Sequence, residues 1–167
     1  MQEARAARAD QSSVPTGRIR RARVAGAIAL LMTAAACEKH EFEPPSREAQ
    51  VAQADSIYSP ALFDTIAWES DSLRLAVGND IFAARCRRCH GYLGQGGPVE
   101  VRGDTVDVPS LVAPDWSYTG DVDAIRRRIF TGHPAGMPIW GIAGLAMREI
   151  DAVAWYIDAV LRQDVEG

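Results

Sequence analysis

Cysteine is scarce in this sequence of 167 residues, which contains only Cys37, Cys86 and Cys89. Three thiols cannot form the dense disulfide framework that supports many small secreted domains. They also cannot complete a four-thiolate zinc site, which needs a second pair of cysteines. The hydrophobic fraction of 47% and the charged fraction of 24% are typical of a globular protein, and the length favours a single domain.

Residues 1–36 contain an apolar run, but it extends only from Val24 to Ala36. A helix that spans a bilayer needs ~20 residues, whereas this run has the length of a secretory signal peptide and follows a cluster of arginines. The small residues before Cys37 resemble a bacterial lipoprotein signal, in which this cysteine receives lipid. The match departs from that pattern at Ala34, where leucine is usual, and cleavage after Ala36 without lipid is the alternative. We expect a signal peptide over residues 1–36 and lipidation of Cys37.

Basic side chains are concentrated in this predicted leader. It holds six of the 18 basic and two of the 22 acidic side chains, so the rest of the chain has eight more acidic than basic groups. An acidic surface repels phosphate backbones, which excludes nucleic acid as the expected partner.

Residues 37–70 are expected to form a tether and extension in front of the folded domain. Residues 38–53 carry Pro44-Pro45 and many charges with little periodicity, so we expect an extended chain that holds the domain away from the membrane. Residues 57–68 are more apolar. They either lie along the surface of the domain or dock onto a membrane partner, and the sequence leaves both interpretations open.

Apolar side chains at helical spacing predict three helices. The first begins at an N-cap at Asp71 or Ser72 and runs into the later cysteines. The others cover residues 121–131, with Asp121 as the expected N-cap, and residues 147–161. Gly78 lies inside the first helix, where glycine costs ~1 kcal/mol relative to alanine. We therefore expect another helix, the last one, to approach closely at this position.

Two stretches between these helices are rich in glycine and proline. Residues 91–107 include several glycines and Pro98, which predicts a loop rather than a strand. Residues 132–141 form a second such loop after the middle helix. No strand is therefore expected, and the predicted fold class is all-α.

The motif Cys86-x-x-Cys89-His90 has the spacing used to attach a c-type haem covalently. Two thiols three positions apart lie on nearly the same side of a helical turn, so each can add to one vinyl group of a porphyrin. His90 is then carried under the ring, where its imidazole can ligate the iron. A thioredoxin-like redox pair would belong beside a βαβ pattern, which this sequence does not show, and a disulfide in so short a helical loop would be strained.

A haem that only transfers electrons needs a second axial ligand from the protein. Met137 lies in the loop 132–141, whose glycines and prolines can hold one thioether rigidly over a ring face. Met147 opens the last predicted helix and is interpreted as a core residue. His133 is the alternative ligand, whereas His40 falls in the tether and is interpreted as solvated.

The chain from about Leu73 to Leu161 resembles class I cytochrome c, the small monohaem bacterial family, in the order and spacing of a set of residues. The residues that carry the resemblance are Gly78, Phe82, Cys86, Cys89, His90, Gly91, Pro109, Leu111, Met137, Pro138, Trp140 and the run from Ala152 to Ile157. The resemblance implies helices packed around one covalently bound haem c, in a domain covering residues 71–163.

The resemblance also implies a role for each matching residue. Cys86 and Cys89 would form the thioether bonds, and Nε2 of His90 and the sulfur of Met137 would be the axial ligands. The carbonyl of Pro109 would accept a hydrogen bond from the other nitrogen of His90. The remaining expectations are that Trp140 covers the haem edge, that Trp116 or Tyr118 reaches a propionate, and that Gly78 and Phe82 cross the last helix near Tyr156.

With both axial positions filled by protein, substrate has no ready access to the iron. We therefore expect an electron carrier rather than an enzyme, tethered to the membrane in a respiratory chain and facing the periplasm or cell exterior, with redox proteins as donor and acceptor. The first alternative is a fixed haem c subunit of a larger membrane oxidoreductase complex. The second is an enzyme or gas sensor with a labile Met137. Arg85, Arg87 and Arg88 either guide an acidic partner or pair with a propionate and nearby carboxylates.

Overall fold

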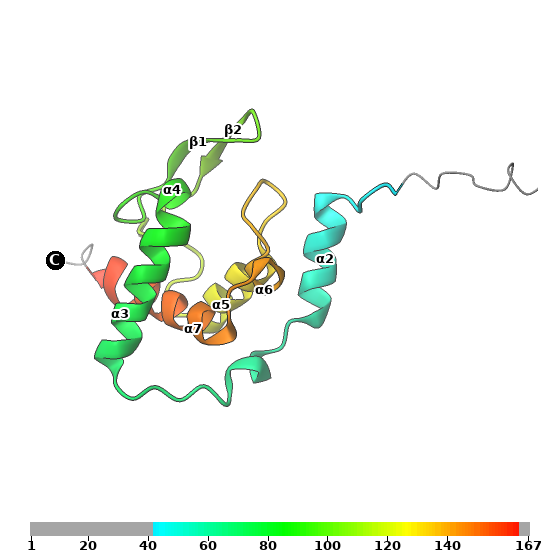
Figure 1. Cartoon of the computed structure of the whole chain (residues 1–167). Helices are drawn as coiled ribbons and strands as arrows, with labels where there is room; N and C mark the ends of the chain where they lie inside the picture. The colour runs from blue at the N-terminus through cyan, green and yellow to red at the C-terminus, as the bar shows by residue number, and fades with distance from the viewer. Residues whose placement is uncertain (1–41, 164–167) are drawn as a thin grey trace, which may run out of the picture. The chain divides into compact units, whose positions relative to one another are not determined.

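The computed structural model of the protein describes residues 42–163, so the predicted signal peptide and Cys37 lie outside the described residues. The elements, in chain order, are α2 (Arg47–Ile57), η1 (Pro60–Phe63), α3 (Asp71–Ile81), η2 (Phe82–Cys86), α4 (Arg87–His90), β1 (Gly97–Val101), β2 (Asp104–Val108), α5 (Val122–Thr131), α6 (Trp140–Ala143), α7 (Met147–Tyr156) and η3 (Ile157–Leu161) (Figure 1). Within the described part of the chain, no helix has the length and apolar character needed to cross a membrane.

Helices α3 and α7 cross at Gly78 (Figure 1). A Cβ atom at this position would lie 2.4 Å from the carbonyl oxygen of Ala152 and 2.6 Å from the Cβ of Tyr156. Any larger residue would push the two helices apart, which confirms the expected close approach. Phe82 lies next to the crossing, with its ring centroid 5.8 Å from that of Tyr156.

Side-chain caps set the starts of two helices. The Oγ of Ser70 accepts a hydrogen bond from the backbone N–H of Leu73 at 3.2 Å, so α3 is capped one residue before the earliest predicted position. Asp121 caps α5 as predicted, because its Oδ1 accepts from the N–H of Ala124 at 2.8 Å.

Wider, π-helical turns extend both crossing helices. The turn η2 carries α3 into Cys86, and η3 carries α7 on to Leu161, so the last helical stretch covers the predicted residues 147–161. Single π-helical turns inside helices are frequent at functional sites. Here the turn η2 directly precedes the His90 motif.

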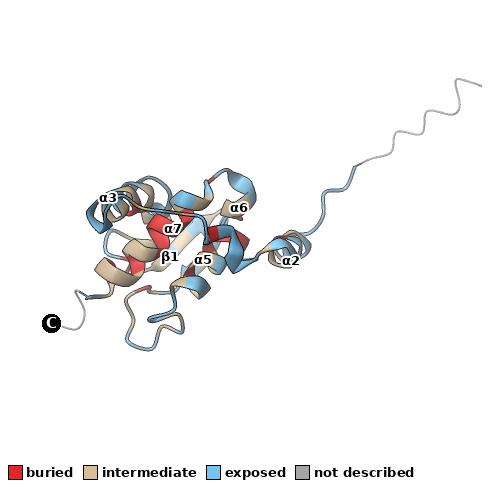
Figure 2. Ribbon diagram, turned by 90° about the horizontal axis from the view of Figure 1, so that it is seen from below, coloured by how far each residue is buried: buried red, intermediate tan, exposed pale blue. Residues whose placement is uncertain are grey.

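The buried core lies mainly on α5 and α7, as the buried residues in Figure 2 show. Its apolar members on these helices and on η3 are Ile125, Ile129, Phe130, Ile150, Ala152, Val153, Ala154, Ile157 and Leu161. Met147 packs against this core as interpreted from the sequence. Trp155 and Tyr156, at the end of α7, are only half-buried.

Residues 91–107 are not all loop, because β1 and β2 form an antiparallel hairpin in which Gly97 pairs with Val108. The all-α prediction is therefore incomplete. Arg102 and Gly103 make the turn with φ of 57° and 93°, and two positive φ angles suit the right-handed twist of a hairpin. The missed signal is the alternation of valines on both sides of Arg102-Gly103, which the nearby glycines and Pro98 obscured.

The segment before α3 also differs from the expected extended tether. Residues 47–57 form helix α2, capped by Ser46, and the compact unit of the fold begins at Pro44. Contacts with α5 stabilise this helix: Nε and Nη2 of Arg127 donate to the two carboxylate oxygens of Asp55, each at 2.7 Å. These contacts are tertiary, so local composition does not reveal them.

Residues 57–68 lie along the domain surface, in agreement with the first of the two interpretations. Phe63 is 6% exposed and belongs to the core cluster. The ring of Tyr58 packs edge-on against that of Phe130, with centroids 5.5 Å apart. The indole Nε1 of Trp68 donates to Oδ2 of Asp151 at 2.6 Å. Phe63 thus belongs to the core and Tyr58 and Ile66 pack against it, whereas Ile57 and Leu62 are exposed.

Candidate haem-binding site

The first half of the site, residues 86–91, is called the proximal turn here. Cys86 ends η2, and Cys89 and His90 follow on the short helix α4. Both thiols are free. Cys86 packs against the core cluster, and burial, with a smaller contribution from Cys89, raises the pKa of its thiol to about 12. Gly91 ends the turn with φ 80° and donates its N–H to the carbonyl of Arg87 at 2.9 Å.

His90 is half-buried, and desolvation lowers the pKa of its imidazole. The neutral ring is therefore favoured, which is the form that ligates metals. Its Nδ1 is buried and has no hydrogen-bond partner. Buried polar groups in proteins are almost always paired. Nδ1 is the nitrogen expected to donate to the carbonyl of Pro109, so its lack of a partner bears on that hydrogen bond and not on ligation through Nε2.

Pro109 does not supply that partner in this structure, because Nδ1 of His90 makes no hydrogen bond. Pro109 and the residues that pack against it, including Gly96, are nevertheless connected to the proximal turn. The N–H of Gly96 donates to the carbonyl of His90 at 2.9 Å. A Cβ at Gly96, where φ is +67°, would lie 2.2 Å from the carbonyl oxygen of Val108 and 2.9 Å from that of Pro109. The role of Pro109 as acceptor stays a prediction.

The second half of the site, residues 132–138, is called the distal loop here. The N–H of His133 donates to the carbonyl of Met137, and the N–H of Gly136 donates to the carbonyl of His133, both at 3.1 Å. Gly132 has φ +68°, and a Cβ there would lie 2.6 Å from the carbonyl oxygen of Met137 and 2.7 Å from that of Pro138. The loop closes tightly on itself and requires glycine at its first position.

The two candidate ligands of the distal loop differ in burial and in partners. Met137 is half-buried and packs against the core cluster. His133 is exposed, and its Nδ1 accepts a hydrogen bond from the N–H of Ala135 at 3.1 Å. One ring nitrogen of His133 therefore holds the loop together, which favours Met137 as the ligand.

One core cluster joins both halves of the site. Cys86 of the proximal turn, Met137 of the distal loop and Trp140 all pack against the buried cluster that includes Phe82 and Leu111. Trp140 opens α6 and is half-buried, and its role as a cover of the haem edge stays a prediction. Residues about fifty positions apart in the chain therefore contact one buried cluster.

These residues fit a covalently attached haem. Two free thiols lie on one turn, an imidazole whose lowered pKa favours the neutral form follows them, and the thioether of Met137 contacts the same cluster as Cys86. An imidazole and a thioether are the ligand pair of electron-transferring c-type centres. Within residues 42–163, neither thiol has a disulfide partner that would compete with thioether formation.

Arginines surround the aromatic pair that was expected to reach a propionate. Trp116 and Tyr118 pack edge to face with ring centroids 5.3 Å apart. Nη2 of Arg128 donates to the hydroxyl of Tyr118 at 2.9 Å, and the guanidinium of Arg162 lies 5.3 Å from the ring of Trp116. Sequence reasoning missed both arginines, because neither is adjacent in sequence to its aromatic partner. Contact of this pair with a propionate stays a prediction.

The most buried charge in the fold was also missed. Asp151 on α7 is 2% exposed. Its Oδ1 accepts from Nη2 of Arg74 on α3 at 2.7 Å and from Nε of Arg126 on α5 at 3.0 Å. It therefore connects the helix that leads into the proximal turn with the helix that leads into the distal loop. Arg126 also forms an ion pair with Asp151, and the neighbouring Arg127 forms one with Asp55.

The three arginines beside the motif show one further contact. The guanidinium of Arg87 lies 4.3 Å from the ring centroid of the exposed Tyr92. Arg85 and Arg88 are exposed. This part of the surface presents positive charge next to the proximal turn on an otherwise acidic protein.

Comparison with known proteins identifies the family. The family model for cytochrome c oxidase, cbb3-type, subunit III matches residues 73–157, about half of the chain. The chain belongs to this family. The matched range contains both thiols, His90 and Met137, and it excludes helix α2.

Curated relatives share the family name. The chain is 29% identical over 120 residues to the cbb3-type cytochrome c oxidase subunit CcoP of Rhodobacter capsulatus, covering 64% of the chain and 38% of the relative. It is 27% identical over 119 residues to the CcoP of Rubrivivax gelatinosus, covering 71% and 36%. It is 34% identical over 80 residues to the subunit FixP of Azorhizobium caulinodans, covering 48% and 25%. The chain spans well under half the length of these relatives, and no solved structure matches it.

Membership in the family confirms the predicted cytochrome c domain and implies a covalently bound haem c. It also favours the first alternative, a haem c subunit of an oxidase complex, over the independent tethered carrier that was the main expectation.

Proposed function

We propose that this chain is a haem c subunit that passes single electrons within a membrane-bound cytochrome c oxidase complex. One haem would be attached at Cys86 and Cys89, with His90 and Met137 as axial ligands. The observation that supports this proposal is that Cys86 of the proximal turn and Met137 of the distal loop both pack against one buried cluster. The names of the curated relatives support the assignment to a complex.

The residues of the chain each have a defined task. When bound, the haem supplies a one-electron iron couple. His90 and Met137 would hold the iron from the protein side, so external ligands would have no ready access and electron transfer would need no substrate at the metal. Cys86 and Cys89 fix the group covalently to one helical turn. Phe82 and the rest of the apolar cluster keep water away, which limits solvent rearrangement when the charge of the iron changes. The chain itself therefore transfers electrons and catalyses no bond chemistry.

The membrane connection is part of the proposal. Lipid on Cys37 would anchor the chain outside the cytoplasmic membrane, and neighbouring integral subunits would hold the domain in place. Replacing Cys37 by alanine in the full-length protein is expected to release it from washed membranes if lipid is the main anchor. Retention of Cys37→Ala in the membrane fraction, with intact haem, would assign anchoring to the partner subunits instead.

The deciding experiment is purification from membranes in mild detergent, followed by a visible spectrum, haem quantification and identification of co-purifying chains. We expect one covalent haem per chain, a near-infrared charge-transfer band of a thioether-bound ferric iron, and co-elution with integral oxidase subunits. A coloured protein that elutes alone under the mildest conditions would favour the independent carrier. A colourless, correctly processed protein would refute both.

A further inference from the structure

Helix α2 lies outside the residues matched by the family model, yet it contacts the distal loop. Its first residue is Arg47, and Nη2 of this side chain donates a hydrogen bond to the backbone carbonyl of Met137, ninety positions away. Nε of Arg47 is buried and has no partner. The guanidinium of Arg47 is thus partly desolvated, and it donates to the backbone carbonyl of Met137, the proposed ligand residue.

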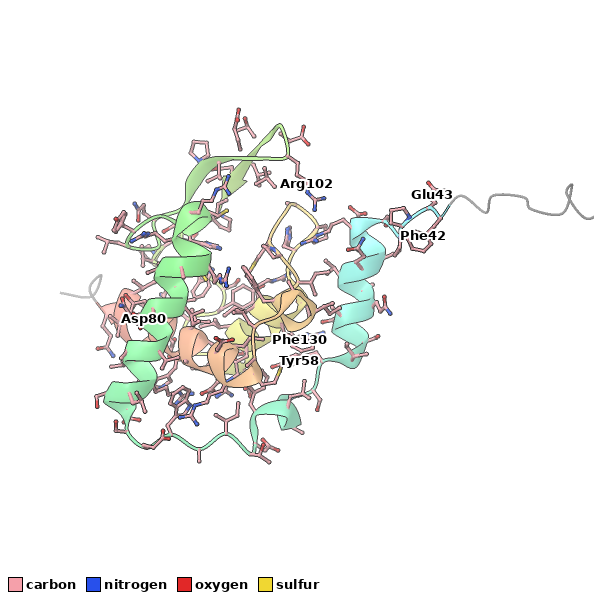
Figure 3. The ribbon with its side chains drawn as sticks, viewed as in Figure 1. Phe42, Glu43, Tyr58, Asp80, Arg102 and Phe130 are labelled. Carbon is pink, nitrogen blue, oxygen red and sulfur yellow. The ribbon has the colours of Figure 1, made fainter. Side chains whose placement is uncertain are left out.

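Other contacts hold α2 in place independently of Arg47. Arg127 binds both carboxylate oxygens of Asp55 near the C-terminal end of α2. The hydroxyl of Tyr58, which follows the helix, donates to the carbonyl of Asp123 at 3.2 Å, and its ring packs on Phe130 (Figure 3). All three partners lie on α5, the helix that continues directly into the distal loop. Helix α5 therefore supports both α2, which carries Arg47, and the distal loop.

The opposite side of the distal loop rests on the hairpin. A Cβ at Gly136 would lie 2.9 Å from Cγ1 of Val101 on β1. Between the hairpin, the loop and α2 is a cavity of about 320 Å³, lined among others by Arg47, Arg102 and Ala135. This cavity leaves room for the loop to move, and Arg47 is the side chain that crosses from α2 to the loop backbone at its edge.

We propose that Arg47 is a positioning residue for the distal ligand. By donating to the carbonyl of Met137, it fixes the backbone from which the thioether extends and so determines how firmly the sulfur stays on the iron. The inference rests on the proposed role of Met137 as axial ligand. A fixed backbone lowers the entropy that the loop must lose when the sulfur binds, so an external ligand has to displace a better-placed competitor.

The test uses the full-length, haem-loaded protein in detergent and the variants Arg47→Ala and Arg47→Lys. Arg148→Ala is the matched control, because Nη1 of Arg148 also donates to a distant carbonyl, that of Ala67, at 2.7 Å. Imidazole is titrated into each ferric protein while the near-infrared charge-transfer band is followed. We expect Arg47→Ala to bind imidazole about tenfold more tightly than wild type, which corresponds to ~1.4 kcal/mol. Arg47→Lys should lie between, and Arg148→Ala should match wild type.

Each outcome has a distinct meaning. Wild-type imidazole affinity in Arg47→Ala, with the band present in both proteins, would overturn the role of Arg47 and leave the proposed function intact. An equal increase in Arg148→Ala would show general loosening of the fold and would also overturn it. Absence of the band from the wild-type protein would refute thioether ligation itself, and with it the inference. Circular dichroism of each variant shows that the helices are retained, and Arg47→Lys keeps the charge if Arg47→Ala fails to fold.

Discussion

The proximal turn and the distal loop contribute to the same site but depend on different parts of the chain. Cys86, Cys89 and His90 follow one another on one helical turn, so their mutual placement is local. The distal loop instead depends on Gly132 within it, on β1 beside it and on Arg47 of α2. A short motif can therefore define one half of a haem site, while the other half needs contacts from distant segments.

Asp151 joins these two halves. Arg74, which binds its carboxylate, lies on the helix that leads into the proximal turn, and Arg126 lies on the helix that leads into the distal loop. Two arginines on one buried carboxylate leave neither helix free to move alone. This connection links the helix before the local motif to the helix before a loop about forty residues later.

Loss of a proximal thiol should have the largest effect. Cys86→Ala leaves at most one thioether, and His90 remains as a ligand. We expect covalent haem to fall to a small fraction of the wild-type content, measured on denatured protein that has been stripped of non-covalent pigment. Ser110→Ala is a suitable control, since its hydroxyl makes only a local turn contact with the N–H of Val112. Full covalent loading of Cys86→Ala would contradict the assignment of the motif.

Loss of the distal thioether should change the iron without removing the haem. A soft thioether ligand favours Fe(II), so Met137→Ala is expected to lower the midpoint potential. A hundredfold loss of this preference corresponds to roughly 120 mV for one electron, at ~59 mV per tenfold change. The ferric protein should also bind imidazole readily. A redox titration identical to that of wild type would exclude Met137, and His133→Ala would then test the other candidate.

The sequence predicts the proximal turn well because everything that defines it is local. The spacing of Cys86, Cys89 and His90 follows from one helical turn, and Gly78 was correctly tied to the crossing of α3 with the last helix. Asp121 was correctly placed as the cap of α5. In each of these cases, the residue type and its position in the helix are sufficient.

The parts that sequence reasoning missed depend on tertiary contacts or on mixed local signals. Helix α2 has only one buried residue, Ala54, so its sequence shows no apolar stripe and its stability comes from α5. The hairpin was hidden because Pro98 and neighbouring glycines indicate a loop more strongly than four alternating valines indicate strands. Asp151 was indistinguishable from a surface carboxylate, since its two arginine partners lie 77 and 25 positions away.

Breaking the connection at Asp151 should destabilise both halves together. Asp151→Ala leaves Arg74 and Arg126 as partly buried charges without their shared carboxylate. Removing one partner of a buried ionic network costs ~3–5 kcal/mol, which we expect as the fall in the free energy of unfolding measured with urea. Asp158→Ala is the control, because this carboxylate only accepts from the N–H of Gly120. A change below about 1 kcal/mol would show that the halves are held by apolar packing alone.

The smallest expected effect concerns the attachment of α2 to α5. The hydrogen bond from Arg127 is the main cause that lowers the pKa of Asp55. Because the pKa of this carboxyl is lower in the folded state, its contribution is complete above the pKa of an unfolded aspartate, about 4. It is lost as the pH falls through the lowered folded value. The pair is largely exposed, so the effect on stability is small.

Imidazole binding to the ferric protein at pH 7 separates this attachment from the rest of the fold. Wild type keeps Asp55 ionised at this pH, because the pKa of its carboxyl is lowered. Asp55→Asn removes the charge and should bind imidazole slightly more tightly than wild type. If Asp55→Asn instead behaves as wild type, then α2 keeps Arg47 on the distal loop through Tyr58 and its contacts with α5, and the ion pair is dispensable.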